Sequence, residues 1–191
     1  YKIAKYEVTN SEFAEFLNLY SSETVKSGVY QGYKLFSSDA NIEKSGGTWK
    51  AKSGTDNLPM THVTWCGAQE FCLFYGGSLP FEAQWEFAAR GGLYTNSDKQ
   101  MYSGSNTLDN VAWTSANSGG TLHAVGGKAP NGYGLYDMSG NATEFCIDWY
   151  YYYPAEYAFN PEANNTRPNK ITRGGSFQST ISSEICNEAR C

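Results

Sequence analysis

The residues of this 191-residue chain that are best suited to chemistry gather near its end, in the stretch RGGSFQSTISSEICNEARC, which begins at Arg173. A Gly-Gly-Ser turn at 174–176 is followed by two thiols, Cys186 and Cys191. Thiolates are soft ligands that suit copper(I) and zinc, and they also carry redox chemistry. The residues between the turn and the thiols are mostly polar, which is typical of a binding loop on a rigid scaffold. The stretch therefore fits a redox or metal site and a bare binding loop equally well.

Two other chemistries find little support in the remaining residues. The chain has five cysteines without a C-x-x-C pair, and two histidines, so a common zinc site would need several of the thiols. Ser176 with His62 or His123 could suggest a hydrolase, but no G-x-S-x-G nucleophile elbow is present. Zinc binding and serine hydrolysis are therefore disfavoured.

Two carboxylates seven residues apart, Asp137 and Glu144, flank a Ser-Gly-Asn turn in the segment YDMSGNATEF. A hard cation such as calcium takes several oxygen ligands from carboxylates and backbone carbonyls, and such a turn can wrap one. The alternative is a plain turn in which Asp137 caps the backbone and Glu144 is solvated. The spacing favours the cation site but leaves the plain turn open.

Amphipathic patterns predict the helices that must position these residues. Segment 7–20 has a capping box at Thr9 and Glu12, followed by an apolar stripe that faces a core. In segment 63–77 the N-cap is Thr64, and Gly-Gly ends the helix. The stripe expected to be buried in this second helix is Trp65, Ala68, Cys72 and Tyr75.

A third, short helix is predicted in segment 79–92, where Pro80 precedes a run with Trp85, Ala88 and Ala89 on one side. Its cap position holds Phe81, which lacks the oxygen that a cap residue normally supplies. Strands are expected at KITRGGSF and at IDWYYYY. Residues 21–60 and 93–131 form long irregular stretches, which in a compact domain are usually functional or tied down.

Composition argues against two classes of partner. The net charge is −5 and the fourteen Lys and Arg residues are scattered, so no nucleic-acid partner is expected. No apolar run approaches the roughly 20 residues that a membrane-spanning helix needs. The 40% hydrophobic content suits a single domain over residues 1–191.

Four ordered blocks of the sequence resemble the formylglycine-generating enzyme family, also called the sulfatase-modifying factor family. The blocks are KYEVTNSEFAEFL, HVTWCGAQEFCLFYGGSLPFEAQWEFAARGG, NVAWTSANSGGTLHAVGGKAPNGYGLYDMSGNATEFCIDWY and RGGSF. The resemblance covers nearly the whole chain and implies the family's α+β fold, a loop-rich variant of the C-type lectin fold with little regular secondary structure. It also implies a closing strand of the GFR type, and the chain is expected to be truncated before that strand.

In the family's enzymes a pair of cysteines soon after the Gly-Gly-Ser turn binds copper(I), activates oxygen and oxidises a sulfatase cysteine to formylglycine. The resemblance carries these positions onto Ser179 and Glu184, and neither supplies a thiolate. Because a two-coordinate copper(I) site needs two soft thiolates, neither copper binding nor oxidase activity is expected. The strongest case for an enzyme is a substitute pair formed by Cys186 and Cys191.

The resemblance also bears on the other cysteines and on metal binding. Family members commonly carry cysteines at the positions of Cys72, Cys146 and Cys186, for which structural disulfides are the favoured role. The implied calcium ligands are the side chains of Asp137 and Glu144 and the backbone carbonyls of Gly140 and Ala142. A second calcium would use Asn110 and the carbonyl of Val111, but the loop that follows offers no acidic partner.

The favoured interpretation is a non-catalytic ligand-binding or adhesion domain that binds a protein or a glycan through its C-terminal polar loop. The residues expected to contact that ligand are Ser176, Gln178, Ser179, Thr180, Glu184 and Asn187. The resemblance suggests a bacterial cell envelope location, periplasmic or surface-exposed. Two alternatives stay open: a copper-dependent oxidoreductase of the formylglycine-generating type, and an accessory structural module of an envelope assembly.

Overall fold

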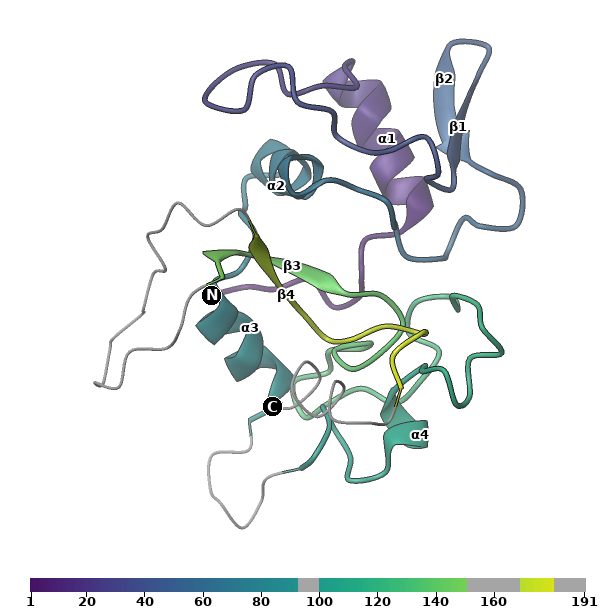
Figure 1. Cartoon of the computed structure of the whole chain (residues 1–191), viewed down its shortest axis with the longest axis vertical. Coiled ribbons are helices and arrows are strands. Elements are labelled where there is room, and N and C mark those ends of the chain that lie inside the picture. The colour runs from purple at the N-terminus through teal and green to yellow at the C-terminus, as the bar shows by residue number, and fades with distance from the viewer. Residues whose placement is uncertain (93–99, 151–168, 181–191) are drawn as a thin grey trace.

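A computed structural model describes residues 1–92, 100–150 and 169–180 (Figure 1). The helices are α1 (Asn10–Tyr20), α2 (Trp65–Phe74), α3 (Glu82–Ala89) and α4 (Leu108–Val111). Strands β1 (Ile42–Ser45) and β2 (Thr48–Ala51) form an antiparallel hairpin, and β3 (Glu144–Trp149) pairs antiparallel with β4 (Lys170–Arg173). The other described residues form turns and irregular loops.

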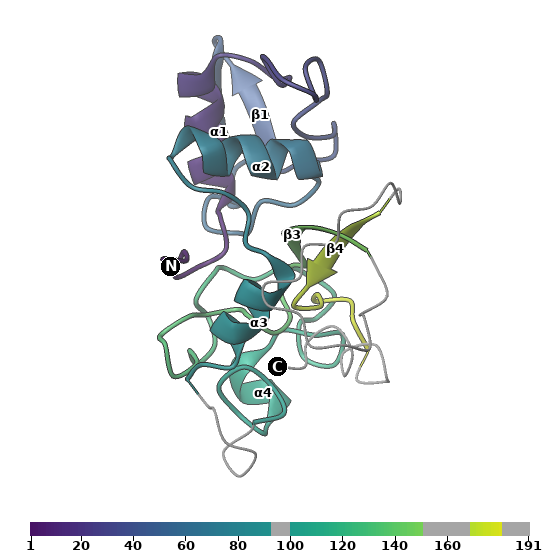
Figure 2. The same cartoon turned by 90° about the vertical axis from the view of Figure 1, so that its left-hand side faces the viewer.

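The short elements are arranged in two groups with separate apolar cores, and α4 packs in a third, smaller cluster. Figures 1 and 2 show α1, α2 and the β1–β2 hairpin at one end, and α3, α4 and the β3–β4 sheet toward the other. The first core is built on the buried face of α1. The second packs α3 against β3 and the loop that precedes it. Burial of apolar surface is the main term that stabilises such a loop-rich fold.

The N-terminal caps of the first two helices are confirmed. The Thr9 hydroxyl accepts a hydrogen bond from the Glu12 N–H at 3.2 Å, and the Glu12 carboxylate accepts one from the Thr9 N–H at 2.8 Å. At α2 the Thr64 hydroxyl accepts from the Gly67 N–H at 3.0 Å. Both caps satisfy backbone donors that a helix N-terminus otherwise leaves unpaired.

The buried face predicted for α2 is wrong. Tyr75 is 54% exposed, and the contact with α1 is made instead by Phe71, whose ring stacks on that of Phe13 with 5.9 Å between centroids. One turn earlier, a Cβ at Gly67 would lie 1.9 Å from the carbonyl oxygen of Leu35. The helix therefore turns its glycine side inward, because only glycine lets the neighbouring backbone approach this closely.

The buried residues predicted for α3, Trp85, Ala88 and Ala89, are confirmed. The cap oxygen that Phe81 lacks comes from a distant strand, since the Glu82 N–H donates to the Asp148 carboxylate of β3 at 2.6 Å. This bond anchors the start of α3 on the sheet.

Both predicted strands are present, with different bounds. β4 occupies the predicted KITR residues, whereas β3 already begins at Glu144, three residues before the predicted segment. The pairing register places Glu144 opposite Arg173 and Trp149 opposite Lys170, with an irregularity between them. The tyrosines 151–153 of the predicted segment lie outside the described residues. The β1–β2 hairpin inside residues 21–60 was not predicted.

Two contacts join α2 to the sheet. The indole N–H of Trp65 donates to the carbonyl of Cys146 at 2.9 Å. The Lys170 ammonium lies 3.9 Å from the ring centroids of both Trp65 and Trp149. A cation held between two indole rings is an attractive contact, so the strand that leads into the C-terminal loop is fixed to the N-terminal half.

The structural disulfides expected at Cys72 and Cys146 are not formed. Cys66, Cys72 and Cys146 are free thiols, and Cys186 and Cys191 lie outside the described residues. Burial raises the pKa of both Cys72 and Cys146, which makes them poor thiolates. Nowhere in the described chain is a helix long and apolar enough to cross a membrane.

Candidate functional site

The loop of residues 137–144, called the acidic loop below, turns its two carboxylates inward. Asp137 is only 3% exposed and has a left-handed backbone (φ 56°). Its carboxylate accepts a hydrogen bond from the Gly126 N–H at 2.6 Å. The Glu144 carboxylate accepts one from the indole N–H of Trp85 at 2.8 Å. The alternative of a plain turn therefore holds in part: Asp137 does accept from a backbone N–H, whereas Glu144 is partly buried and bonded to Trp85.

A third carboxylate, Glu7, reaches the same loop from the segment before α1. One of its oxygens accepts a hydrogen bond from the side-chain amide of Asn141 at 2.7 Å, and the other accepts from the Ala142 N–H at 2.9 Å. Sequence reasoning missed this residue, because it lies more than 130 positions away along the chain. The only feature of the local sequence that marks Glu7 is its position two residues before the N-cap Thr9.

The three carboxylates share a poorly solvated region and repel one another. Burial raises the pKa of Glu7 well above its usual range, and the charges of Glu144 and Asp137 raise it further. Burial raises the pKa of Glu144 to about 7. The hydrogen bond from Trp85 lowers this pKa, and the charge of Asp137 raises it further. Burial also raises the pKa of Asp137. Such a cluster is stabilised either by protons or by a bound cation.

The donor set of the acidic loop fits a hard cation. It offers carboxylate oxygens, and no described donor hydrogen-bonds to the buried carbonyl oxygens of Gly140 and Ala142. In the part of the chain that the structure describes, no three or more histidine, cysteine, aspartate or glutamate side chains are placed so that they could hold a metal ion together. Calcium would therefore draw on backbone carbonyls as well as carboxylates, which is a common mixture for this ion.

Residues 174–180, called the C-terminal loop below, are held in place mainly by backbone groups. The Ser176 N–H donates to the Ser179 hydroxyl at 2.9 Å, and the Ser179 N–H donates to the Ser176 carbonyl at 3.0 Å. The carbonyl of Ser179 in turn accepts from the N–H and the hydroxyl of Ser115 at 3.2 and 3.0 Å. The side chains of Gln178 and Thr180 are exposed on this anchored turn.

The acidic loop and the C-terminal loop are directly bonded to each other. The Gly140 N–H donates to the Gly174 carbonyl, and the Phe177 N–H donates to the Asn141 carbonyl, both at 2.8 Å. Asn141 is fully buried, and its amide also contacts Glu7. The acidic loop and the C-terminal loop are therefore joined through the backbone of residues 140 and 141.

Comparison with known families identifies the domain to which this site belongs. The family model described as "Sulfatase-modifying factor enzyme 1-like domain" matches residues 1–191. The chain belongs to this family. The sulfatase-modifying factor resemblance drawn from the four sequence blocks is thus confirmed.

Relatives in the sulfatase-modifying factor family include named enzymes. The chain is 29% identical over 227 aligned positions to the formylglycine-generating enzyme of Mus musculus, with 97% of this chain and 57% of that protein covered. It is 32% identical over 233 positions to that of Thermomonospora curvata, with 99% and 72% covered. The chain therefore spans little more than half the length of its mammalian relatives.

The fold of the sulfatase-modifying factor domain is also found in solved structures. Treponema denticola variable protein 1 superposes with a TM-score of 0.65 at 24% identity, covering 96% of this chain and 74% of that one. The expected α+β fold of the formylglycine-generating enzyme type, rich in loops, is confirmed by this match and by the short elements described above.

The predicted site residues of this sulfatase-modifying factor domain separate into four groups. Asp137, Gly140, Ala142 and Glu144 gather around the acidic loop, and Ser176, Gln178, Ser179 and Thr180 gather on the C-terminal loop bonded to it. Glu184 and Asn187 lie outside the described residues. Asn110 and Val111, proposed for a second calcium, belong to α4. Val111 is buried in an apolar cluster, and the Asn110 side-chain amide donates to the Ser105 hydroxyl at 3.5 Å; the second calcium stays a prediction.

Proposed function

We propose that this chain is a non-catalytic binding domain on the formylglycine-generating enzyme scaffold, which captures a protein or glycan through its C-terminal loop. The proposal rests on the residue at position 179, which is a serine and not a cysteine. This residue stands where the resemblance places the first copper-binding cysteine, and its hydroxyl is built into a turn by the hydrogen bond from the Ser176 N–H.

The chemistry of that position favours binding over oxidation. Copper(I) prefers soft sulfur ligands, whereas a serine hydroxyl is a hard oxygen with a high pKa. The Ser179 oxygen is moreover already occupied as a hydrogen-bond acceptor. The same turn presents Gln178 and Thr180 outward from an anchored backbone. Polar side chains on a rigid scaffold are typical of recognition loops.

Calcium is the ion proposed for the acidic loop. Asp137 and Glu144 would hold it together with the carbonyls of Gly140 and Ala142, and when bound it supplies positive charge that offsets the repulsion among these two carboxylates and Glu7. The side chain of Glu7 then ties the N-terminal segment to the acidic loop. The hydrogen bonds of residues 140 and 141 keep the C-terminal loop in its binding shape. The cell envelope is the proposed location.

Oxidase chemistry is tested by a direct assay. Aerobic incubation of the reduced protein with copper and a sulfatase-motif peptide should leave the peptide cysteine unchanged, because Ser179 provides no thiolate. Conversion to formylglycine is read by mass spectrometry, with the Thermomonospora curvata enzyme as the positive control. Conversion at a rate comparable to the control would overturn the non-catalytic proposal.

The second candidate function, a copper-dependent oxidoreductase, is favoured by the names of the relatives at 29% and 32% identity. Its thiolates would have to be Cys186 and Cys191. If the assay shows conversion, Cys186→Ser and Cys191→Ser should each abolish it. Persistence of conversion in both variants would point to Cys66 or Cys72 instead.

Ligand capture through the C-terminal loop is tested by substitution. The double variant Gln178→Ala/Thr180→Ala should lose at least about tenfold in affinity for ligands found on glycan and surface-protein arrays, since recognition energy concentrates in a few central side chains. Its melting temperature is measured in parallel, so that a loss of folding is distinguished from a loss of binding. The control Gln31→Ala/Thr48→Ala removes the same side chains from other exposed positions. Equal capture by both double variants would contradict the proposal.

A further inference from the structure

Helix α2 is apolar on almost every side, yet little of it is buried. Of its ten residues only Gln69 and Glu70 have strongly polar side chains, and only Gly67 is buried. A helix that is hydrophobic all round is normally enclosed by other elements. Figure 2 shows α2 lying across α1 on the side that faces the viewer. The outer side of α2 is therefore a surface whose composition suits contact with another molecule.

The most exposed part of this surface is the end of α2, where three apolar side chains follow one another. Leu73 is 52% exposed, Phe74 42% and Tyr75 54%. The two rings are nevertheless held in place from below. Phe74 meets the ring of Phe16 on α1 with 5.4 Å between centroids, and Tyr75 meets that of Phe71 at 5.0 Å. Aromatic side chains that are already ordered lose little conformational entropy on binding, and such side chains often anchor protein interfaces.

The neighbouring side of α1 supplies negative charge. Glu12, Glu15 and Leu19 are exposed there and lie on one stripe, because they are three and four residues apart. Burial raises the pKa of the Tyr75 hydroxyl, and the charges of Glu15 and Glu12 raise it further, so these carboxylates lie near the exposed rings. Neither Glu12 nor Glu15 forms an ion pair with a described residue. Their charges are therefore available to a partner.

Positive charge is scarce on the two helices. Neither α1 nor α2 contains a lysine or an arginine, so neither helix has a cation in its own last turn to compensate the negative end of its dipole. The Lys26 ammonium does lie 4.5 Å from the ring centroid of Tyr20, whose hydroxyl donates to the Glu70 carboxylate at 2.9 Å. The carboxylates of Glu12, Glu15 and Glu70 outnumber this ammonium.

A groove of about 780 Å³ lies beside α2 and gives the surface depth. Phe71 and Tyr75 form part of its lining, so the groove is continuous with the exposed end of the helix. The charged side chains among its described lining residues are Lys2, Glu7 and Glu144. The groove thus adds an apolar wall and a further excess of carboxylates. A partner that complements this surface has apolar side chains and positive charge.

We infer that this surface docks a basic amphipathic segment of a partner protein. The surface, called the α1–α2 face below, consists of Glu12, Glu15, Leu19, Leu73, Phe74 and Tyr75. Apolar side chains of the segment would pack on the two rings, and its lysine or arginine side chains would pair with the two carboxylates. Because the backbone of a helix is hydrogen-bonded internally, side chains and not strand addition carry the recognition.

A second copy of the chain fits the α1–α2 face less well. A symmetric contact would bring the same carboxylates of both copies together, which is unfavourable. The basic segment supplies the opposite charge instead. This docking does not depend on the proposed function of the C-terminal loop, which lies on other elements.

The experiment titrates the full chain with a short amphipathic peptide of leucine and lysine, using isothermal titration calorimetry at low ionic strength, where exposed charges are least screened. Two comparison peptides keep the same pattern, one with glutamate in place of lysine and one with serine in place of leucine. The leucine–lysine peptide should bind in the micromolar range, and the other two at least about tenfold more weakly. Phe74→Ala should weaken the binding at least about tenfold, and Glu15→Lys at least about fivefold.

Each variant has a matched control away from the α1–α2 face. Tyr33→Ala removes an exposed ring from the loop after α1, and Glu43→Lys reverses an exposed charge on β1. Both controls and the Gln178→Ala/Thr180→Ala variant should bind the leucine–lysine peptide as the wild type does. Melting temperatures verify that each variant is folded. Because Glu15 is exposed, Glu15→Lys keeps the test decisive if Phe74→Ala does not fold.

Four results would overturn the docking inference. The first is equal binding of either comparison peptide, and the second is binding by Phe74→Ala or Glu15→Lys as tight as that of its control. The third is a wild-type dimer in analytical ultracentrifugation that Phe74→Ala abolishes, since a second copy would then cover the face. The fourth is binding to phosphatidylcholine vesicles without binding to the leucine–lysine peptide, since the face would then be a lipid contact.

Discussion

Removal of calcium by EGTA at pH 7.5 should lower the melting temperature of the protein by on the order of 5–10 °C when calcium was present at about a hundred times its Kd. The reason is the repulsion among Glu7, Asp137 and Glu144, whose charges are left uncompensated in a poorly solvated region. Asp137→Ala and Glu144→Ala should no longer respond to chelation. Differential scanning calorimetry with and without EGTA provides the measurement.

Asp39→Ala, which removes an exposed carboxylate elsewhere, is the control and should respond to EGTA as the wild type does. Absence of any shift in the wild-type protein would contradict calcium binding. A shift of equal size in all four proteins would place the ion at another site.

The same cluster makes the chelated protein sensitive to pH. Glu144 has its pKa raised from 4.5 to about 7 in the folded state, so the folded protein keeps a proton that the unfolded chain has already lost. The contribution of Glu144 to the free energy of unfolding is therefore greatest below pH 4.5. This contribution is lost as the pH rises through about 7. The loss is on the order of 3 kcal/mol. In EGTA the protein should be more stable at pH 5.5 than at pH 7.5, and Glu144→Gln should flatten this dependence.

Gly140→Ala should destabilise the protein by roughly 2–5 kcal/mol and weaken the C-terminal loop with it. Gly140 has a φ of +80°, and an added Cβ would lie 2.3 Å from the carbonyl oxygen and 2.9 Å from the nitrogen of Trp113. Both atoms belong to the backbone, so the clash cannot be relieved by rotating a side chain. Unfolding in urea gives the free energy of unfolding of the variant.

Gly134→Ala separates backbone strain from the clash. Gly134 has nearly the same φ, +77°, but an added Cβ there would meet nothing within 4 Å. This control should lose only about 1–2 kcal/mol, the strain of a left-handed alanine. The difference between the two variants measures the contact between the acidic loop and Trp113. Equal losses would show that this contact is not as close as the structure has it.

Features that depend on neighbouring residues were correctly predicted from the sequence. The capping bonds at Thr9 and Thr64 each join atoms within three residues, so the pattern contains both partners. The spacing of the apolar residues in α1 and α3 likewise predicts which face is buried, because each of these helices packs against a single core. That Asp137 and Glu144 flank one turn is also visible in the sequence, whereas their binding of calcium stays a prediction.

Features that depend on distant residues were missed or predicted wrongly. The buried face of α2 is determined by the Leu35 carbonyl, which only Gly67 can approach. The spacing of apolar residues within the helix carries no information about the backbone of Leu35. The cap of α3 comes from Asp148, 66 residues away. Such partners are chosen by packing between elements, which is a property of the whole fold.

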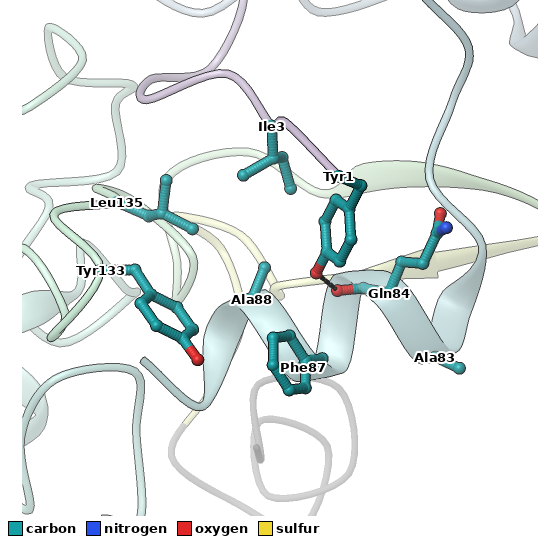
Figure 3. Close-up of a pocket in the computed structure, with 8 residues that line it drawn as sticks. All are labelled: Tyr1, Ile3, Ala83, Gln84, Phe87, Ala88, Tyr133 and Leu135. Carbon is teal, nitrogen blue, oxygen red and sulfur yellow. Dashed lines mark hydrogen bonds between the residues drawn. The ribbon is translucent and has the colours of Figure 1, made fainter. Parts of the chain in front are cut away.

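The sequence by itself thus determined the family, the α+β class, two helix caps and the carboxylate pair of the acidic loop, because each follows from residues close together or from a matching order of motifs. Only the tertiary structure added Glu7 to that pair and joined the acidic loop to the C-terminal loop through Asn141. It also brought the rings of Tyr1 and Tyr133 into contact with Phe87 of α3 (Figure 3). These arrangements arise because chain segments far apart in sequence must bury polar groups against one another and satisfy their hydrogen bonds.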